Sequence, residues 1–468
     1  MEKQYGKKYY ECVDFLFLET TTAGLFQIAG DSPIGLMLDS DGVPLLPGTS
    51  IAGAVQDYLK EKKNTNYPSF WGDSVSRYDN KVYFYDSPLR NDLSSGLENV
   101  IDIRKCHAHD KELGGAADKK MFERTFLKQG CRFHVIVKVF SLRTEKKQVE
   151  AFFQDMAKGI QKGWILFGGN KNAGAGQLRI ERVKHAHFDM FDLSSLKSYY
   201  LFQPLEINDP SYVEYGFSQE GMNNQVISIS LDGQIRDAIL LKGEDKETDE
   251  EGHQIATSIK SNGQYIISGT TWKGVLRSYC EKICKTLEMG EEKRTDLLEV
   301  MFGTNNDGTK NGEKQQCGKV RVHDTVIEEP ATKCYTRIKI DRFTGGTISG
   351  AKLTSNAITK GKVKIALEFL PIMEEVQRKQ AIALLFLTVR DLGLSKIPLG
   401  SMASVGFGRI RGTQISISIP EKYRIDWDIK EQENIDLEVE DRKASLICSD
   451  KVRTYLEECI GLLAREDV

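Results

Sequence analysis

The sequence predicts an α+β protein made of two ferredoxin-like (RRM-like) domains in tandem, each with a long β-hairpin inserted between its central strands. Three observations lead to this prediction. Five short blocks recur in the same order at nearly constant spacing, which indicates an internal duplication. Within each copy, hydrophobic periodicity follows the order β-α-β-β-α-β. The chain has 468 residues, 40% hydrophobic and 28% charged, which suits two such globular domains.

The duplication rests on blocks that pair at offsets from 221 to 238 residues. The pairs are Pro47-Gly48-Thr49-Ser50 with Ser268-Gly269-Thr270-Thr271, residues 70–72 with 301–303, 81–86 with 319–324, 110–115 with 341–346, and 168–176 with 400–408. Coincidence of Gly-rich turns is the alternative, but chance matches do not keep both order and spacing. We therefore predict a first domain at 1–195, a second at 196–420, and an acidic segment with a C-terminal helix at 421–468.

The first copy opens with a strand at residues 15–18. Thr49 or Ser50 then caps a helix. That helix has one apolar face, formed by Ile51, Val55, Tyr58 and Leu59. Strands follow at 82–85 and 133–140. A second helix then presents Val149, Phe152, Phe153, Met156 and Ile160 on one side, and a strand at 177–183 closes the copy.

The second copy repeats this pattern. Its first helix carries the apolar face Trp272, Val275, Leu276, Tyr279 and Ile283, and Cys280 and Cys284 suit its core. Strands are predicted at 320–323, 363–370 and 409–417, with a helix near 376–392. Beyond the repeat, residues 451–463 have the spacing of an amphipathic helix, which either docks a partner or packs on the domain.

Composition narrows the function further. The longest apolar run, residues 381–389, is far below the roughly 20 residues of a membrane span, and we predict a cytoplasmic protein without a membrane partner. Read as one number, the net charge of −3 argues against a nucleic-acid partner. However, residues 426–441 and 243–252 alone contribute −7 and −5, so the remaining chain is net positive.

The nine cysteines are odd in number and form no CxxC pair, which is typical of reduced, cytosolic thiols. Cys106, His107 and His109, together with Cys131, are candidate ligands for a zinc ion. Their spacing matches no standard closed zinc site, so it does not support zinc as a cofactor.

The start of the first helix in each copy is a candidate phosphate site. Its unpaired N–H groups and the positive end of the helix dipole attract anions. In the second copy Lys273 and Arg277 add positive charge, whereas the first copy has Ala52 and Gln56 at the matching positions. Ordinary helix capping is the alternative for a single block, and the duplication favours a function.

Each copy ends with a glycine-rich loop, at residues 168–176 and 400–408. Glycine permits a ligand to approach the backbone closely. Neither loop continues into the Gly-Lys-Ser/Thr of a P-loop, and neither is a G-x-G-x-x-G sequence opening a helix, so nucleotide hydrolysis is disfavoured. A polynucleotide backbone is the better candidate ligand.

The inserted hairpins carry positive charge. Residues 333–363 hold seven Lys or Arg against one acid, with Tyr335 and Phe343 among them, and residues 101–130 hold seven against five. Basic strands interleaved with aromatic side chains suit RNA, through phosphate attraction and base stacking. A solvated hairpin is the alternative for each.

These features together resemble the RAMP (repeat-associated mysterious protein) superfamily of CRISPR-associated proteins. The chain looks most like the backbone subunits of type III effector complexes, here as two fused copies. The resemblance rests on the Pro47-Gly48-Thr49-Ser50-x-x-Gly53 block with its echo at 268–274, on the loop that ends Gly406-Phe407-Gly408-Arg409 with its weaker form at 168–177, and on the insertions that end in Gly-Gly.

The resemblance implies a subunit that binds crRNA, target RNA and other CRISPR effector subunits, with a thumb-like hairpin that wedges between guide and target bases. The RNA-binding residues that we predict on this basis lie in the helix starts, the loops and the second hairpin. They are Gly48, Thr49, Ser50, Gly53, Gly168, Lys171, Gly174, Gly176, Gly269, Thr270, Thr271, Lys273, Arg277, Arg337, Lys339, Arg342, Gly400, Gly406, Gly408 and Arg409.

Many type III backbone subunits also cut the paired target RNA with an aspartate in the loop after the first strand. By resemblance, the Asp31-Ser32-Pro33 sequence places this residue at Asp31, with Asp39 and Asp41 as weaker alternatives. A divalent metal, Mg²⁺ by resemblance, would assist it. The second copy lacks Asp-Ser-Pro, so Asp249 or Glu251 could serve there, although a solvated acidic loop is the simpler interpretation. A non-catalytic crRNA-binding scaffold is the alternative function.

Overall fold

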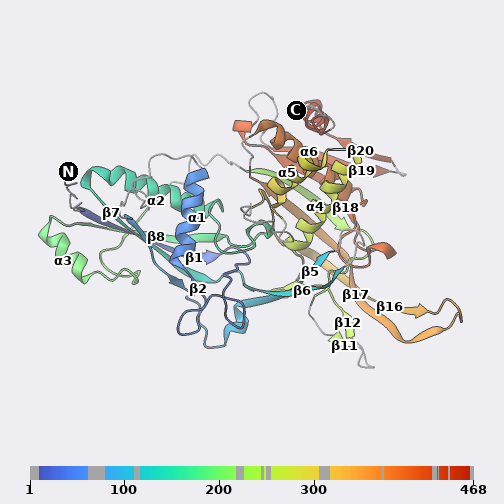
Figure 1. The fold of residues 1–468 in the computed structure, drawn as a ribbon, viewed down its shortest axis with the longest axis horizontal. Coiled ribbons are helices and arrows are strands. Elements are labelled where there is room, and N and C mark those ends of the chain that lie inside the picture. Colours follow the sequence, from blue (N-terminus) through green and yellow to red (C-terminus); the bar gives the residue numbers. More distant parts are fainter. Residues whose placement is uncertain are drawn as a thin grey trace. The chain divides into compact units, whose positions relative to one another are not determined.

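The computed structural model describes residues 10–61, 80–109, 116–217, 226–243, 247–248, 254–304, 317–370, 374–423, 430, 432–440 and 443–463. Its contacts divide the chain into two compact units (Figure 1). The first comprises Met1–Ile103, Arg124–Lys171 and Ala175–Met222, and the second comprises Arg104–Glu123, Asn172–Gly174 and Asn223–Val468. Both units combine a β-sheet with helices, so the predicted mixture of α and β structure is confirmed.

The first unit is built on an antiparallel sheet with the strand order β3-β7-β1-β8-β9. The strands are β1 (Cys12–Thr22), β3 (Val82–Phe84), β7 (Arg132–Ser141), β8 (Leu178–Asp189) and β9 (Val213–Glu214). Helices α1 (Gly48–Glu61) and α2 (Lys146–Gln161) pack on one face. Alternate residues of β1, Leu16 and Leu18, enter that core beside Val55 of α1 and Phe152 of α2.

The opposite face of this sheet is also apolar. Val13, Phe15 and Phe17 alternate with the residues of the first core and form a second, aromatic cluster. Helix α3 (Leu193–Leu201) and the segment after it cover this face, with the Phe202 ring 4.8 Å from that of Phe15. Because β1 carries apolar side chains on both of its faces, both faces of the sheet must be covered, and α3 covers the second one.

Smaller elements complete the first half of the chain. They are β2 (Leu45–Leu46) paired with β4 (Ser87–Pro88), the hairpin of β5 (Ile101–His109) and β6 (Ala116–Leu127), and the short turns Leu97–Asn99, Arg143–Glu145 and Lys171–Ala173. The β5–β6 hairpin is the insertion predicted between the central strands of the first copy. It lies between β3 and β7 in the sequence, and these two strands pair with each other in the sheet.

The sheet of the second unit contains the order β15-β17-β10-β18, which repeats β3-β7-β1-β8. Its strands are β10 (Ile227–Ile235), β15 (Val320–Val322), β17 (Thr347–Phe369), β18 (Ile410–Ser418), β19 (Gln432–Glu440) and β20 (Lys443–Ile447). Even the irregularities match: the register shifts at Glu19/Thr20 in the first sheet and at Asp232/Gly233 in the second. Both shifts lie on the central strand, against the last strand of the copy.

The described residues of the second unit form four helices: α4 (Gly269–Thr286), α5 (Glu291–Phe302), α6 (Glu375–Gly393) and α7 (Asp450–Gly461). The buried face of α4 is Trp272, Leu276, Cys280 and Cys284, which confirms the two cysteines as core residues. Helix α6 is buried over most of its length, because α4 and α7 pack on it and β18 lies beneath it.

The long hairpin of the second copy is formed by β16 (Thr325–Ile340) and the first part of β17. Short strands flank it: β11 (Glu247–Thr248), β12 (Gln254–Ala256), β13 (Lys260–Ser261) and β14 (Gln264–Ile267). β14 pairs with the start of β16, at the base of the hairpin, and β12 pairs in parallel with the middle of the β17 arm, through Ile255 and Thr354. The hairpin is therefore held at its base by β14 and part-way along by β12.

Two sequence expectations need correction. Helix α1 begins at Gly48, so Pro47 and not Thr49 or Ser50 stands before its first turn, and the Pro47 carbonyl accepts the N–H groups of Ser50 and Ile51. The C-terminal segment, predicted as an acidic segment with a helix, contains α7 (Asp450–Gly461) and in addition β19 and β20, which extend the sheet beside β18. Within the described part of the chain, none of the helices has the length and hydrophobicity that a membrane span needs.

Candidate nucleic-acid interface

The first helix of each copy starts against a carboxylate from the same unit. Asp86 Oδ1 accepts the Gly48 N–H at 2.7 Å, and Asp324 Oδ1 accepts the Gly269 N–H at 2.8 Å. A Cβ on Gly48 would lie 2.3 Å from the Phe84 carbonyl oxygen. The two helix starts therefore share one construction, in which glycine allows the turn to lie directly on the neighbouring strand.

This construction changes what the helix starts can bind. An internal carboxylate already occupies the positive end of each helix dipole, where an RNA phosphate would meet a like charge. In the second unit Asp324 also pairs with Arg104 at 2.8 Å, and both side chains are largely buried. Thr49, Ser50 and Thr270 remain exposed to RNA approaching from the side, and the Thr270 hydroxyl also shares a hydrogen bond with the Ser268 hydroxyl at 2.9 Å.

The glycine-rich loops have the same backbone geometry in both units. Gly168 and Gly400 adopt left-handed φ angles of +72° and +78°. The next residue donates its N–H to a facing carbonyl at 2.8 Å in each case, Gly169 to Gln27 and Ser401 to Leu240. The residues before the loops, Phe167 and Leu399, bond across to Gly176 and Gly408 at 2.9 and 2.8 Å. Each loop is thus closed by backbone bonds, independently of its side chains.

In the second unit the loop and the basic hairpin come together. Phe407, between Gly406 and Gly408, is only 6% exposed. The Tyr335 ring of β16 meets it edge-on at 5.2 Å, and the Arg337 guanidinium lies 4.6 Å from its centroid. Arg337 also donates to the Met402 sulfur within the same loop. Two of the predicted RNA-binding blocks are therefore neighbours in the fold.

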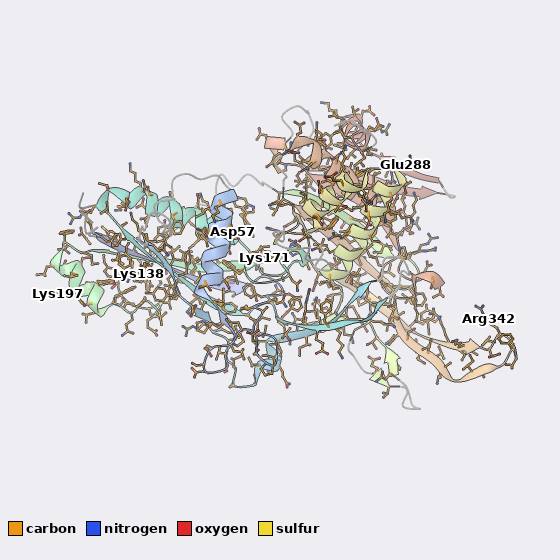
Figure 2. The ribbon with its side chains drawn as sticks, in the orientation of Figure 1. Asp57, Lys138, Lys171, Lys197, Glu288 and Arg342 are labelled. Atoms are coloured by element: carbon orange, nitrogen blue, oxygen red, sulfur yellow. The ribbon has the colours of Figure 1, made fainter. Side chains whose placement is uncertain are left out.

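Beyond this joint the hairpin extends as an exposed ribbon. Lys339 and Arg342 are exposed, and Arg342 lies near the hairpin tip (Figure 2). Phe343, beside it, is 99% exposed, and the Asp341 carboxylate accepts the N–H groups of Phe343 and Thr344 to fix the turn. Cationic side chains beside a solvent-facing ring are the combination that single-stranded nucleic acid binds.

The remaining cations fall into two groups. Lys171 belongs to the first loop, and Arg409, which follows the second loop, is exposed. Lys273 and Arg277 instead lie within α4. Arg277 donates to the Gly303 carbonyl at 2.8 Å, and burial lowers the pKa of its guanidinium. Arg277 thereby stabilises the end of α5. A contact between Arg277 and an RNA phosphate stays a prediction, and a purely structural role at α5 is the alternative.

Asp31 lies at the tip of a tight turn. The turn is closed by Gly30 and Gly35, and the Ser32 hydroxyl bonds both backbone groups of Leu36. Asp31 is exposed, and among the described residues no hydrogen bond or ion pair engages its carboxylate. Asp39, by contrast, accepts the N–H groups of Asp41 and Val43 and so shapes the next turn. Of these three candidates, Asp31 and Asp41 are exposed to solvent and Asp39 is committed to the fold.

The predicted ligands for metals are only partly visible. Asp249 and Glu251 lie outside the described residues, as do the side chains of Cys106, His107 and His109 on β5. Cys131 is buried, and burial raises the pKa of its thiol to about 11, which disfavours the thiolate that zinc needs. Over the described portion of the chain, no three His, Cys, Asp or Glu side chains are grouped to hold a metal ion.

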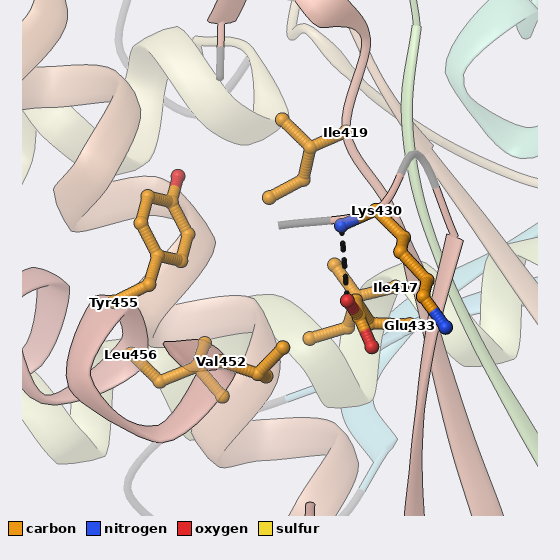
Figure 3. A pocket seen from close by; sticks show the side chains of 7 residues that line it. All are labelled: Ile417, Ile419, Lys430, Glu433, Val452, Tyr455 and Leu456. Carbon is orange, nitrogen blue, oxygen red and sulfur yellow. Dashed lines mark hydrogen bonds between the residues drawn. The ribbon is translucent and has the colours of Figure 1, made fainter. Parts of the chain in front are cut away.

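A small pocket lies in the second unit between β18, β19 and α7 (Figure 3). Its walls are mainly apolar, from Ile417, Val452, Tyr455 and Leu456, and the Glu433 carboxylate at its edge accepts the Lys430 N–H at 3.0 Å. Such a lining suits the contact between α7 and the sheet, and offers little to an RNA phosphate.

Sequence reasoning missed three sets of residues at these sites. Asp86 and Asp324 end two blocks that were already paired, so their recurrence was the available signal. Phe407 gave no signal, because its contacts come from a hairpin 70 residues away. Asp14 on β1 accepts hydrogen bonds from His185 and His187 at 2.9 and 2.8 Å, and only the alternation of His185 and His187 along one strand hinted at their shared face.

Comparison with known proteins supports part of this picture. Residues 221–411 match the model of the RAMP superfamily, a span that covers the long hairpin and most of the second unit but less than half of the chain. The match supports a CRISPR-associated, RNA-binding role at the level of that superfamily. None of the curated proteins compared matches the chain.

Proposed function

We propose that this chain is a crRNA-binding backbone subunit of a type III CRISPR ribonucleoprotein, built from two ferredoxin-like copies, which cleaves guide-paired target RNA. The observation that carries the proposal is the joint between the second glycine-rich loop and the basic hairpin. It places Arg337, Lys339 and Arg342 on one ribbon that starts at a loop whose glycines permit close approach of a phosphate backbone.

The tandem arrangement is supported by contacts that recur in both units. The Asp86–Gly48 and Asp324–Gly269 bonds are equivalent, and the two loops are closed by equivalent backbone bonds. The four-strand order and the position of the register shift also recur. Agreement at backbone level is more informative than shared glycines, because it reproduces the three-dimensional role of each block.

For cleavage we assign Asp31. An exposed carboxylate at a turn tip can accept the proton of an RNA 2′-hydroxyl or orient that group toward the neighbouring phosphorus. A single carboxylate does not form a closed metal site, but it fits Mg²⁺ held jointly with RNA phosphates, which is a common arrangement for this ion. A bound ion would supply positive charge at the scissile phosphate.

The decisive experiment compares Asp31→Ala with Asp57→Ala, a matched change at an exposed aspartate of α1, in the assembled complex. We expect D31A to abolish cleavage of guide-paired RNA and to leave crRNA binding intact, whereas D57A should retain both. Undiminished cleavage by D31A would remove Asp31 from the mechanism.

The second candidate is a crRNA-binding scaffold without catalysis. It is favoured by the fact that, among the described residues, Asp31 belongs to no group of three His, Cys, Asp or Glu side chains that could hold a metal ion. A reconstituted complex that binds guide and target RNA but shows no metal-dependent cleavage would establish this alternative.

A further inference from the structure

A small apolar cluster, separate from the main core, joins the second loop to the hairpin. We call it the loop–hairpin joint. It consists of Ala238, Leu240, Ala357 and Phe407, with Ala256, Tyr335 and Met402 packed against them. Phe407 is the largest buried member of the cluster, since the other buried members are two alanines and one leucine. The cluster therefore depends on one buried aromatic ring.

That ring organises the cations of the hairpin. The Arg337 guanidinium lies 4.6 Å from the centroid of Phe407, and Lys333 lies 5.6 Å from that of Tyr335, which itself touches Phe407. Tyr335 and Arg337 are two residues apart on β16 and so share one face of the ribbon. An aromatic ring under a guanidinium restricts where the charge can point.

Comparison of the two loops separates this role from loop folding. The first loop has Ala175 at the position of Phe407, and Ala175 is also buried. Nevertheless, the first loop makes the same closing bonds, between Phe167 and Gly176 and between Gly169 and Gln27. The loop conformation thus does not need an aromatic side chain. The contacts that Phe407 adds are with the hairpin.

We propose that Phe407 is a positioning residue, which fixes the basic face of the β16–β17 hairpin against the glycine-rich loop so that the two grip one RNA backbone together. The proposal rests on the RNA-binding function proposed above and assigns the grip to a residue without charge or hydrogen-bonding groups. Its consequence is that an uncharged substitution weakens an electrostatic interaction.

The test measures binding of fluorescein-labelled poly(U) RNA to the full chain across a salt series. Phe407→Ala should weaken binding about three- to fivefold, as expected for loss of one cation–aromatic contact. It should also reduce the slope of log affinity against log salt by about one phosphate contact, although no charge has changed. Phe407→Tyr keeps the ring and should restore both values.

Three further variants sharpen the test. Arg337→Met should give the same loss, and Phe407→Ala should add little to it, because both changes release the same charge. Tyr265→Ala on β14 removes a comparable contact, in which Lys260 lies 4.8 Å from the ring, and should leave the salt slope unchanged. Phe407→Leu replaces Phe407→Ala if the alanine protein does not fold.

Hydrogen exchange of residues 333–339 provides a readout that does not depend on RNA. Faster exchange there in Phe407→Ala than in wild type supports the positioning role, and unchanged exchange overturns it. Wild-type affinity and slope in Phe407→Ala would likewise overturn it. If the wild-type chain does not bind poly(U), the proposed function fails, while the exchange measurement still decides whether Phe407 orders the hairpin.

Discussion

Alanine at Gly400 and at Gly406 should have different consequences for stability and RNA binding, although both glycines belong to one loop. Both have left-handed φ angles, +78° and +94°. A Cβ on Gly400 would lie 2.6 Å from the Leu240 carbonyl oxygen, whereas a Cβ on Gly406 would meet no atom within 4 Å. Gly400→Ala must therefore displace the carbonyl that accepts the Ser401 N–H, and Gly406→Ala displaces nothing.

The magnitudes follow from these contacts. Left-handed backbone costs an alanine about 1–2 kcal/mol at either position. At Gly400 the loss of the hydrogen bond between Ser401 and Leu240 adds about 1 kcal/mol. We expect Gly400→Ala to destabilise the second unit by about 2–3 kcal/mol and Gly406→Ala by about 1–2 kcal/mol. The open space beside Gly406 is where RNA can approach the loop, so its methyl group should lower RNA affinity.

The assay is urea denaturation of the full chain, with hydrogen exchange of α4 reporting the second unit, followed by poly(U) binding under conditions where each variant is folded. Gly406→Ala should be the more stable variant and bind RNA more weakly than wild type. Equal destabilisation by the two changes would refute the role assigned to Leu240. Wild-type RNA affinity in Gly406→Ala would refute close approach of RNA to this loop.

Two further predictions concern ion pairs in which one partner, Asp14 or Arg104, is buried. Hydrogen bonding to Asp14 raises the pKa of His187. Burial alone would raise the pKa of Asp14, but the hydrogen bonds from His185 and His187 outweigh burial, and the pKa of Asp14 is lowered. The Asp14 contribution to stability is present above the ordinary aspartate pKa, about 4, and the His187 contribution is lost as pH rises through its raised pKa, above about 6.5. Wild-type stability should therefore fall on the alkaline side, and His187→Gln should lack this fall in urea denaturation; an identical pH profile would contradict it. Asp324→Ala removes the acceptor of Gly269 and the partner of Arg104, and should cost about 1.5–3 kcal/mol; a variant as stable as wild type would show that the helix start does not need its carboxylate.

Periodicity was sufficient where a segment has one buried face. Ile51 and Val55 on α1, and Phe152 and Met156 on α2, recur at helical spacing, and all four are buried in the same core. The central strand β1 carries a different signal, the continuous apolar run at residues 15–18, because both of its faces are buried. The start of α1 was not predictable, because the acceptor at its first turn is Asp86, which is distant in sequence and replaces a local cap.

Periodicity failed where burial is two-sided or masked by charge. Helix α3 has apolar residues around its circumference, with Leu193 and Leu201 exposed and Tyr199 against the sheet, so no single stripe marks it. In β19 the inward Ile435 and Leu437 alternate with acidic residues, and the acid count hid the alternation. Helix α3 is held in part by Phe15 of β1, a distant contact that local sequence cannot specify, whereas β19 pairs with β18 and β20, its neighbours along the chain.

The candidate interface shows a related division. Its scaffold is made of backbone bonds and glycine contacts, which recur in both units because the same turns need them. Its side chains differ: Phe407 stands where the first loop has Ala175, and the basic hairpin of the second copy has a less basic counterpart at 101–130. Because the loop backbone closes without Phe407, the loop conformation itself does not require a ring at that position. Under the proposed function, the first copy, which carries Asp31, would cut RNA and the second copy would grip it. Such a division between gripping and cutting predicts that Phe407→Ala lowers RNA affinity without changing the cleavage rate at saturating RNA. Asp31→Ala should abolish cleavage without changing RNA affinity. If Phe407→Ala lowers the cleavage rate of saturated complexes as strongly as it lowers affinity, the two copies do not divide the work.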